Sequence, residues 1–223
     1  VRVRSEVTSI DKEKKCITYT QLDTHKILTV PYDKLVLSPG TTPVFPPIKG
    51  INLPNIFTLK DVNDTDAIKS HLSKHTGNSR KTAVVVGAGF IGLEMAENLH
   101  KIGMKVVIVE KAAHVMPTID PEISLTLQQH LLEKDVQIYT ENAVASFQAE
   151  GEKTAVHLEK GEVITADFIL ISVGVKPLTT LARQADLTIG KTGGIAVNEY
   201  MQTSDPQIYA IGDAVETTNP ITG

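Results

Sequence analysis

The chain has 223 residues, of which 41% are hydrophobic and 22% charged, a composition typical of a globular protein rather than a disordered or fibrous one. Its 22 basic and 26 acidic residues give a net charge of -4, which argues against nucleic acid or an anionic membrane as a partner. The most apolar stretch, 168–175, is far shorter than the roughly 20 residues of a membrane-spanning helix. The single cysteine, Cys16, excludes an internal disulfide and favours a cytoplasmic location.

The first quarter of the chain predicts short strands and a linker. The chain begins inside an alternating strand pattern and ends in a polar loop, so we expect it to be part of a longer one. A brief apolar strand at 35–37 leads into Ser38-Pro39-Gly40, and the prolines of 43–54 predict an irregular linker. Alternation of apolar and polar residues predicts antiparallel strands at 7–10, 16–19 and 26–30.

The remainder mixes helices with apolar strands. A helix is predicted over 61–74, with Asp64 or Thr65 as its N-cap and Gly77 at its end. Continuous Val/Ile runs are typical of a parallel sheet that is covered on both faces. The other predicted helices are 90–102 and 120–134, and the other predicted strands are 82–86, 105–109, 136–139, 143–148, 155–158, 163–165, 168–172 and 208–211.

The most specific motif is Gly87-Ala88-Gly89-Phe90-Ile91-Gly92, a G-x-G-x-x-G sequence between a predicted strand and a predicted helix. In such a loop Gly87 permits a tight turn, Gly89 lets the backbone approach a pyrophosphate, and Gly92 allows close packing of helix on strand. The N–H groups of the helix N-terminus would bind the pyrophosphate. Glu110 ends the next strand, where a carboxylate meets the adenosine ribose, and Lys111 follows it. The alternative is a glycine-rich turn without a ligand.

Two weaker patterns end in glycine. The apolar strand 208–211 delivers Gly212-Asp213-Ala214, in which Asp213 could bind a polyol or merely cap a helix. Ser38-Pro39-Gly40 and Ser172-Val173-Gly174 each follow an apolar strand with a small residue and a glycine. A buried helical stripe of Ile91, Met95 and Leu99 is also expected.

In this order, the motifs resemble the FAD-dependent pyridine nucleotide-disulfide oxidoreductase family. Details at 64–68 and 212–216 are most similar to its CoA-disulfide reductase and NADH oxidase branch. The resemblance implies an α/β fold in which a Rossmann-like nicotinamide-binding domain is inserted into a partial FAD-binding domain of the same type. The expected borders are 1–61 and 189–223 for the flavin domain and 62–188 for the nicotinamide domain.

The resemblance also implies residue roles. Asp213 would bind the flavin ribityl chain, Phe90 would gate the flavin ring, Glu94 would lie near the nicotinamide, and the Val7 backbone would touch the flavin adenine. The expected residues for FAD and NAD together are Val7, Ser38, Pro39, Gly40, Gly87, Ala88, Gly89, Phe90, Ile91, Gly92, Glu94, Glu110, Lys111, Gly174, Gly212, Asp213 and Ala214.

The implied parent enzyme passes hydride from NADH to FAD and then electrons to a disulfide, persulfide or oxygen species. In this family a cysteine near the first flavin motif takes part, and a C-terminal domain forms a homodimer; neither lies in this chain. Cys16 lies in an alternating strand without a partner cysteine, so no catalytic residue is expected here. His71 and His75 lack a third metal ligand, and no metal is expected.

Two other functions remain open from the sequence. An NADH-dependent ferredoxin or rubredoxin reductase of the same architecture needs no redox cysteine. A dinucleotide-sensing module would bind the coenzyme without turnover.

Gly190-Lys191-Thr192 resembles the end of a P-loop, but Ala185 stands where that loop requires glycine.

Overall fold

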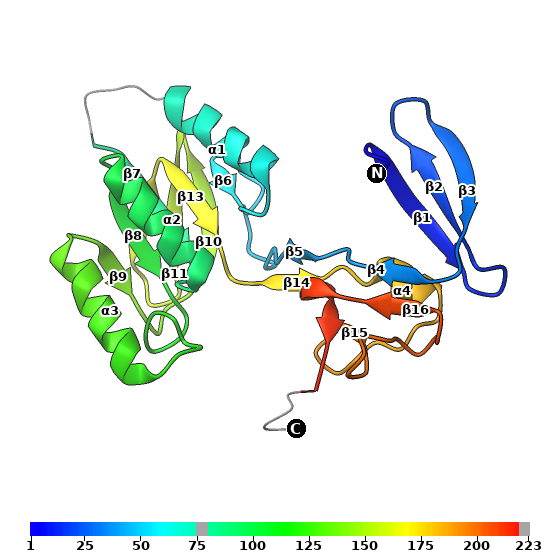
Figure 1. The fold of residues 1–223 in the computed structure, drawn as a ribbon. Helices are drawn as coiled ribbons and strands as arrows, with labels where there is room; N and C mark the ends of the chain where they lie inside the picture. Colours follow the sequence, from blue (N-terminus) through cyan, green and yellow to red (C-terminus); the bar gives the residue numbers. More distant parts are fainter. Residues whose placement is uncertain (75–79, 219–223) are drawn as a thin grey trace. The chain divides into compact units, whose positions relative to one another are not determined.

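The computed structural model describes residues 1–74 and 80–218. They form two compact units, one built from Val1–Thr42 and the chain from Val175 onward, the other from Pro43–Gly174. In sequence, the second unit is therefore inserted between two pieces of the first (Figure 1). None of the described helices is long and apolar enough to cross a membrane.

A five-stranded parallel sheet is the centre of the inserted unit. Its strand order is β6-β13-β7-β8-β9. The central strands are runs of Val and Ile that are buried on both faces, as the sequence predicts for a covered parallel sheet. The strands are β6 (Ile56–Phe57), β7 (Thr82–Val86), β8 (Lys105–Val109), β9 (Gln137–Tyr139) and β13 (Phe168–Ile171).

Each face of this sheet has its own cover (Figure 1). Val85 and its neighbours on one face pack with the helices, which contribute Ile68, Ala96 and Leu99. Val84 and its neighbours on the other face pack against a small antiparallel sheet. Alternate strand residues thus enter two different cores. The helices are α1 (Val62–Lys74), α2 (Phe90–Lys101) and α3 (Pro121–Glu133), and the small sheet is β10 (Val144–Glu150), β11 (Lys153–Leu158) and β12 (Val163–Ala166).

The other unit combines a three-stranded meander with short paired strands. Its core joins residues from both pieces of the chain, including Ile10, Leu37, Ala182, Ile195 and Ile208. The strands β4 and β16 pair in parallel, as do β15 and β17. The elements are β1 (Ser5–Asp11), β2 (Cys16–Gln21), β3 (Lys26–Pro31), β4 (Leu35–Leu37), β5 (Thr41–Pro43), β14 (Val175–Pro177), α4 (Thr180–Gln184), β15 (Ile195–Ala196), β16 (Ile208–Ala210), the 3-10 turn η1 (Gly212–Ala214) and β17 (Val215–Glu216).

The α/β class and the inserted parallel sheet are as predicted, but the borders of the units differ from 1–61, 62–188 and 189–223. Residues before position 62 join the inserted unit because β6 extends its sheet, pairing Ile56 with Ile169. Residues after Gly174 leave that unit because Ala182 and Leu187 are buried in the core of the other one.

The expected cap of α1 is also corrected. The Asp61 carboxylate accepts hydrogen bonds from the N–H groups of Asn63 (2.8 Å) and Asp64 (3.1 Å), so Asp61, rather than Asp64 or Thr65, is the N-cap. Asp64 instead accepts from the backbone of Asp61 and Lys60, which completes a reciprocal capping arrangement at the start of the helix. Gly77, the expected end of the helix, lies outside the described residues.

Candidate dinucleotide-binding site

Gly87 and Gly92 are glycines because the fold leaves no room for a side chain. Gly87 has φ of +101°, a conformation that L side chains rarely adopt, and its N–H donates to the Val109 carbonyl at 2.8 Å. A Cβ on Gly87 would run into the backbone of Ser172. A Cβ on Gly92 would overlap the carbonyl oxygen of Gly87. These two positions bring α2 against the ends of β7 and β13.

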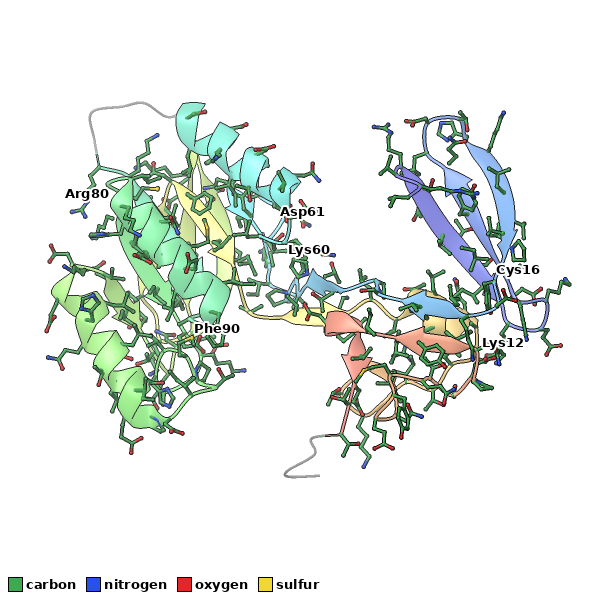
Figure 2. All side chains as sticks on the ribbon, viewed as in Figure 1. Lys12, Cys16, Lys60, Asp61, Arg80 and Phe90 are labelled. Atoms are coloured by element: carbon green, nitrogen blue, oxygen red, sulfur yellow. The ribbon has the colours of Figure 1, made fainter. Side chains whose placement is uncertain are left out.

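Gly89 is different, because nothing lies within 4 Å of the place where its Cβ would be. Its φ of -79° is accessible to any residue, and it stands at the N-cap of α2 without a side-chain hydrogen bond to the helix. The first N–H groups of α2 thus have no side-chain cap, and uncapped N–H groups at a helix N-terminus can bind an anion. Phe90, which begins the helix and is labelled in Figure 2, is 70% exposed.

Glu110 lies at the end of β8, next to the glycine loop. One carboxylate oxygen accepts from the N–H of Ala88 at 2.7 Å, and the other accepts from the N–H of Ala112 at 2.8 Å. Each oxygen retains acceptor capacity for a further donor, such as a ribose hydroxyl. The next residue, Lys111, is exposed.

The segment after Lys111 contributes a residue that the sequence analysis missed. Met116 has φ of +48° and donates its N–H to the Ala88 carbonyl at 2.8 Å. The Ser124 hydroxyl of α3 donates in turn to the Met116 carbonyl at 3.1 Å. These bonds are made by backbone atoms of Met116, so no side-chain pattern could have identified it.

The structure brings a second set of predicted residues together in the other unit. Parallel pairing of β4 with β16 aligns Leu37 with Ala210, and the Ile211 N–H donates to the Leu37 carbonyl at 2.9 Å. Ser38 and Gly212 therefore follow neighbouring strand ends, and a Cβ on Gly212 would lie 3.5 Å from the Ser38 hydroxyl. Further along these two ends lie Pro39, Gly40, Asp213 and Ala214, of which Asp213 is exposed and Ala214 is buried.

Three further predicted residues lie elsewhere in the structure. Val7 is half-buried in β1, opposite Tyr19. Gly174 is exposed after β13, and its carbonyl accepts from the N–H of Val44 at 3.0 Å. Glu94 is exposed one turn beyond Phe90 and lines a groove of about 610 Å³ beside α2 and α3.

The expected buried stripe of α2 is wrong at its first member. Ile91 is 44% exposed and Met95 is half-buried, although Leu99 is buried as predicted. The buried residues of the helix are Gly92, Ala96 and Leu99. The first two of these are small, and at position 92 even a Cβ would overlap the Gly87 carbonyl oxygen.

The Gly190-Lys191-Thr192 segment encloses a carboxylate of the chain itself. Glu216 accepts hydrogen bonds from the backbone N–H groups of Lys191 and Thr192 and from the Thr192 hydroxyl. The Thr192 hydroxyl, followed by these N–H groups, lowers the pKa of Glu216 below its ordinary value. The loop therefore fastens β17, which follows directly after Asp213 and Ala214.

Three further residues are candidates for chemistry by residue type, namely Cys16, His71 and His75. Cys16 is a free, half-buried thiol in β2 (Figure 2). Within 1–74 and 80–218, no three His, Cys, Asp or Glu residues are grouped to hold a metal ion. His71 packs against Phe57 and Phe168, which stack on each other, and His75 lies outside the described residues.

Known proteins are similar to this chain in sequence and fold. A NADH oxidase of Methanocaldococcus jannaschii is 38% identical over 193 residues, which are 86% of this chain and 42% of that protein. The NAD-dependent persulfide reductase from A. fulgidus superposes with a TM-score of 0.91 and 36% identity, over 98% of this chain and 40% of that one. Bacillus anthracis CoADR-RHD, a CoA-disulfide reductase, gives 0.89 and 43% over 95% of this chain and 37% of that one.

This chain spans less than half the length of each of these proteins. The sequence model of one family covers nearly the whole chain, residues 1–222. The chain belongs to the pyridine nucleotide-disulphide oxidoreductase family.

Proposed function

We propose that the inserted unit binds NADH through the loop Gly87–Gly92. The observation that carries this proposal is the contrast among its glycines: two are packed against backbone, whereas Gly89 faces open space at the uncapped N-terminus of α2. A pyrophosphate at this position would meet backbone N–H groups and the positive end of the helix dipole. Ala88 and Ile91 would contribute backbone to the same cradle, and Glu110 would accept from the adenosine ribose.

We further propose that the other unit contributes to an FAD site. The donors and acceptors that would face the flavin are Asp213, for the ribityl hydroxyls, and the backbone of Gly212 and Ala214. Ser38, Pro39 and Gly40 support this assignment because β4 and β16 end side by side. Val7, at the flavin adenine, and Gly174, beside the crossing between the units, remain proposals from the family resemblance.

The full protein would then be an oxidoreductase that passes hydride from NADH to FAD and on to a disulfide, persulfide or oxygen species. The bound flavin would supply the hydride-accepting chemistry. The role of this chain is to hold both cofactors, with Phe90 as the gate over the flavin ring and Glu94 near the nicotinamide. The exposure of Phe90 supports the first of these roles, since a gate must be free to change position.

Gly89→Val tests the dinucleotide site directly. The Cβ of the new side chain has no protein atom within 4 Å and the backbone conformation is open to any residue, so the fold should be retained, while the side chain would occupy the space that the pyrophosphate needs. We expect calorimetric titration of the full-length protein to give a Kd for NADH at least tenfold above that of the wild type, with a similar unfolding temperature. Wild-type affinity in the variant would show that the loop is only a structural turn.

A further inference from the structure

One peptide group of the glycine loop is held from both sides by the ends of neighbouring strands. The Ser172 hydroxyl, just past β13, lies 2.9 Å from the carbonyl oxygen of Gly87. The Glu110 carboxylate, just past β8, lies 2.7 Å from the N–H of Ala88. Since β7 lies between β13 and β8, the peptide that follows β7 is bonded to both neighbours.

The chemistry of the two partners selects one orientation of this peptide. In a trans peptide, the carbonyl and the N–H point in opposite directions. A flipped Gly87–Ala88 peptide would direct its carbonyl oxygen at the Glu110 carboxylate, which has no proton to donate when ionised. In the observed orientation, Ser172 donates to the carbonyl and Glu110 accepts from the N–H.

The hydroxyl proton of Ser172 is available for donation to the Gly87 carbonyl. The Val86 carbonyl lies 3.1 Å from the same hydroxyl, but it already accepts from the backbone N–H of Ser172 at 2.8 Å. The shorter contact of the hydroxyl is the one to Gly87. Gly92 lacks a side chain at the same place, where a Cβ would lie 2.8 Å from the Ser172 hydroxyl oxygen.

The next peptide of the loop joins Ala88 to Gly89 and is also held by a hydrogen bond. Met116 donates to the Ala88 carbonyl, so the N–H of the same peptide, that of Gly89, points away from Met116. We infer that Ser172 is a positioning residue for dinucleotide binding, which aligns the loop N–H groups through the Gly87 carbonyl. This inference rests on the proposed NADH site and adds a residue that touches no coenzyme atom.

Ser172→Ala tests the inference in the full-length protein. Loss of one neutral hydrogen bond to the loop should raise the Kd for NADH about 3- to 10-fold. Hydrogen exchange of the 87–92 segment should become faster in the same variant. The matched control is Thr154→Val, which removes a buried hydroxyl that donates to Asn55 at 2.8 Å in the small antiparallel sheet. The control should lower the unfolding temperature and leave the Kd unchanged.

Each outcome separates the inference from the proposed function. A raised Kd together with faster exchange at 87–92 supports the positioning role. A Kd within twofold of the wild-type value, or a raised Kd without faster exchange, overturns it and leaves the NADH site standing. A wild-type protein that binds no NADH removes the proposed site and the inference together.

Discussion

The three motif glycines meet three different physical demands. Gly87 needs a positive φ, Gly92 needs contact with a carbonyl oxygen, and Gly89 needs neither. Packing therefore does not require the absence of a side chain at Gly89, although glycine is a favoured N-cap residue. The proposed NADH site accounts for it, since the pyrophosphate would occupy the open space, and the proposal therefore depends on this residue more than on the other two.

The demand at Gly92 can be measured as stability. Gly92→Ala places a methyl group on the Gly87 carbonyl, and overpacking of this kind costs about 1–3 kcal/mol. Gly89→Ala should cost no more than about 1 kcal/mol, because it loses only the N-cap preference for glycine over alanine and its Cβ meets no protein atom within 4 Å. Urea unfolding of both variants checks the contrast. Equal destabilisation would mean that helix capping, rather than backbone contact, governs both positions.

Glu110 should determine which coenzyme is preferred. Its carboxylate would oppose the additional phosphate of NADPH, with partial compensation from Lys111, for a penalty of about 1.5–3 kcal/mol. This corresponds to a preference for NADH of roughly 10- to 150-fold. We expect Glu110→Gln to reduce this preference, measured by competition binding of the two coenzymes.

A control follows from the hydrogen bonds of Glu110 with the loop. Glutamine retains one acceptor oxygen, so one of the bonds from Ala88 and Ala112 is lost. Disruption of the loop alone would weaken NADH and NADPH equally and leave their ratio at the wild-type value. An unchanged ratio would therefore remove the carboxylate from coenzyme selection.

At the scale of elements, the long strands and helices followed from local pattern. The Val/Ile runs of β7 and β8 and the glycine loop between them are local signals, and the structure places them as predicted. The two-residue strand β6 has no such signal, because Ile56 and Phe57 become a strand only by pairing with β13. The helix α4 has five residues and is fixed by burial of Ala182 rather than by a periodic pattern.

The residues of the candidate site likewise include some that the sequence predicts and others that it does not. The glycine spacing and the acid at position 110 could be predicted because they match a known motif in the linear sequence. The roles of Ser172 and Met116 depend on contacts between segments that are distant in sequence. Their partners are backbone carbonyls, which have no signature in the amino-acid letters.

The loop around Glu216 gives a pH prediction at this scale. Because the folded state lowers the pKa of this carboxyl, its contribution to stability is present above the ordinary value of 4.5 and is lost as pH falls through the folded pKa. Glu216→Gln should therefore destabilise the protein at pH 7 and have a smaller effect near pH 3.

Urea midpoints at the two pH values provide the measurement. Thr192→Val removes the largest cause of the lowered pKa and should weaken the pH dependence without abolishing it. Glu199→Gln, a substitution of an exposed acid in the same unit, serves as the control for charge alone. The same difference between wild type and Glu216→Gln at both pH values would contradict the linkage.

At the scale of the whole molecule, the two units have separate cores, and each holds one set of candidate residues. The loop 87–92 and Glu110 belong to the inserted unit, whereas Ser38 and Asp213 belong to the other. Residues that share no contacts give nearly additive effects on stability and binding. Damage to one set should therefore leave the affinity of the other for its own cofactor intact.

Asp213→Ala and Gly89→Val together test this independence. Loss of the charge-assisted hydrogen bonds of Asp213 should cost about 1.5–3 kcal/mol of binding free energy, which corresponds to a roughly 10- to 150-fold lower affinity for FAD. In the full-length protein, Asp213→Ala should lose flavin absorbance on dialysis and retain the wild-type Kd for NADH, whereas Gly89→Val should show the reverse. Glu199→Gln controls for the change in charge. If Asp213→Ala retains its flavin, the aspartate has no role in FAD binding; if the variant also binds NADH more weakly, the two sites are coupled rather than independent.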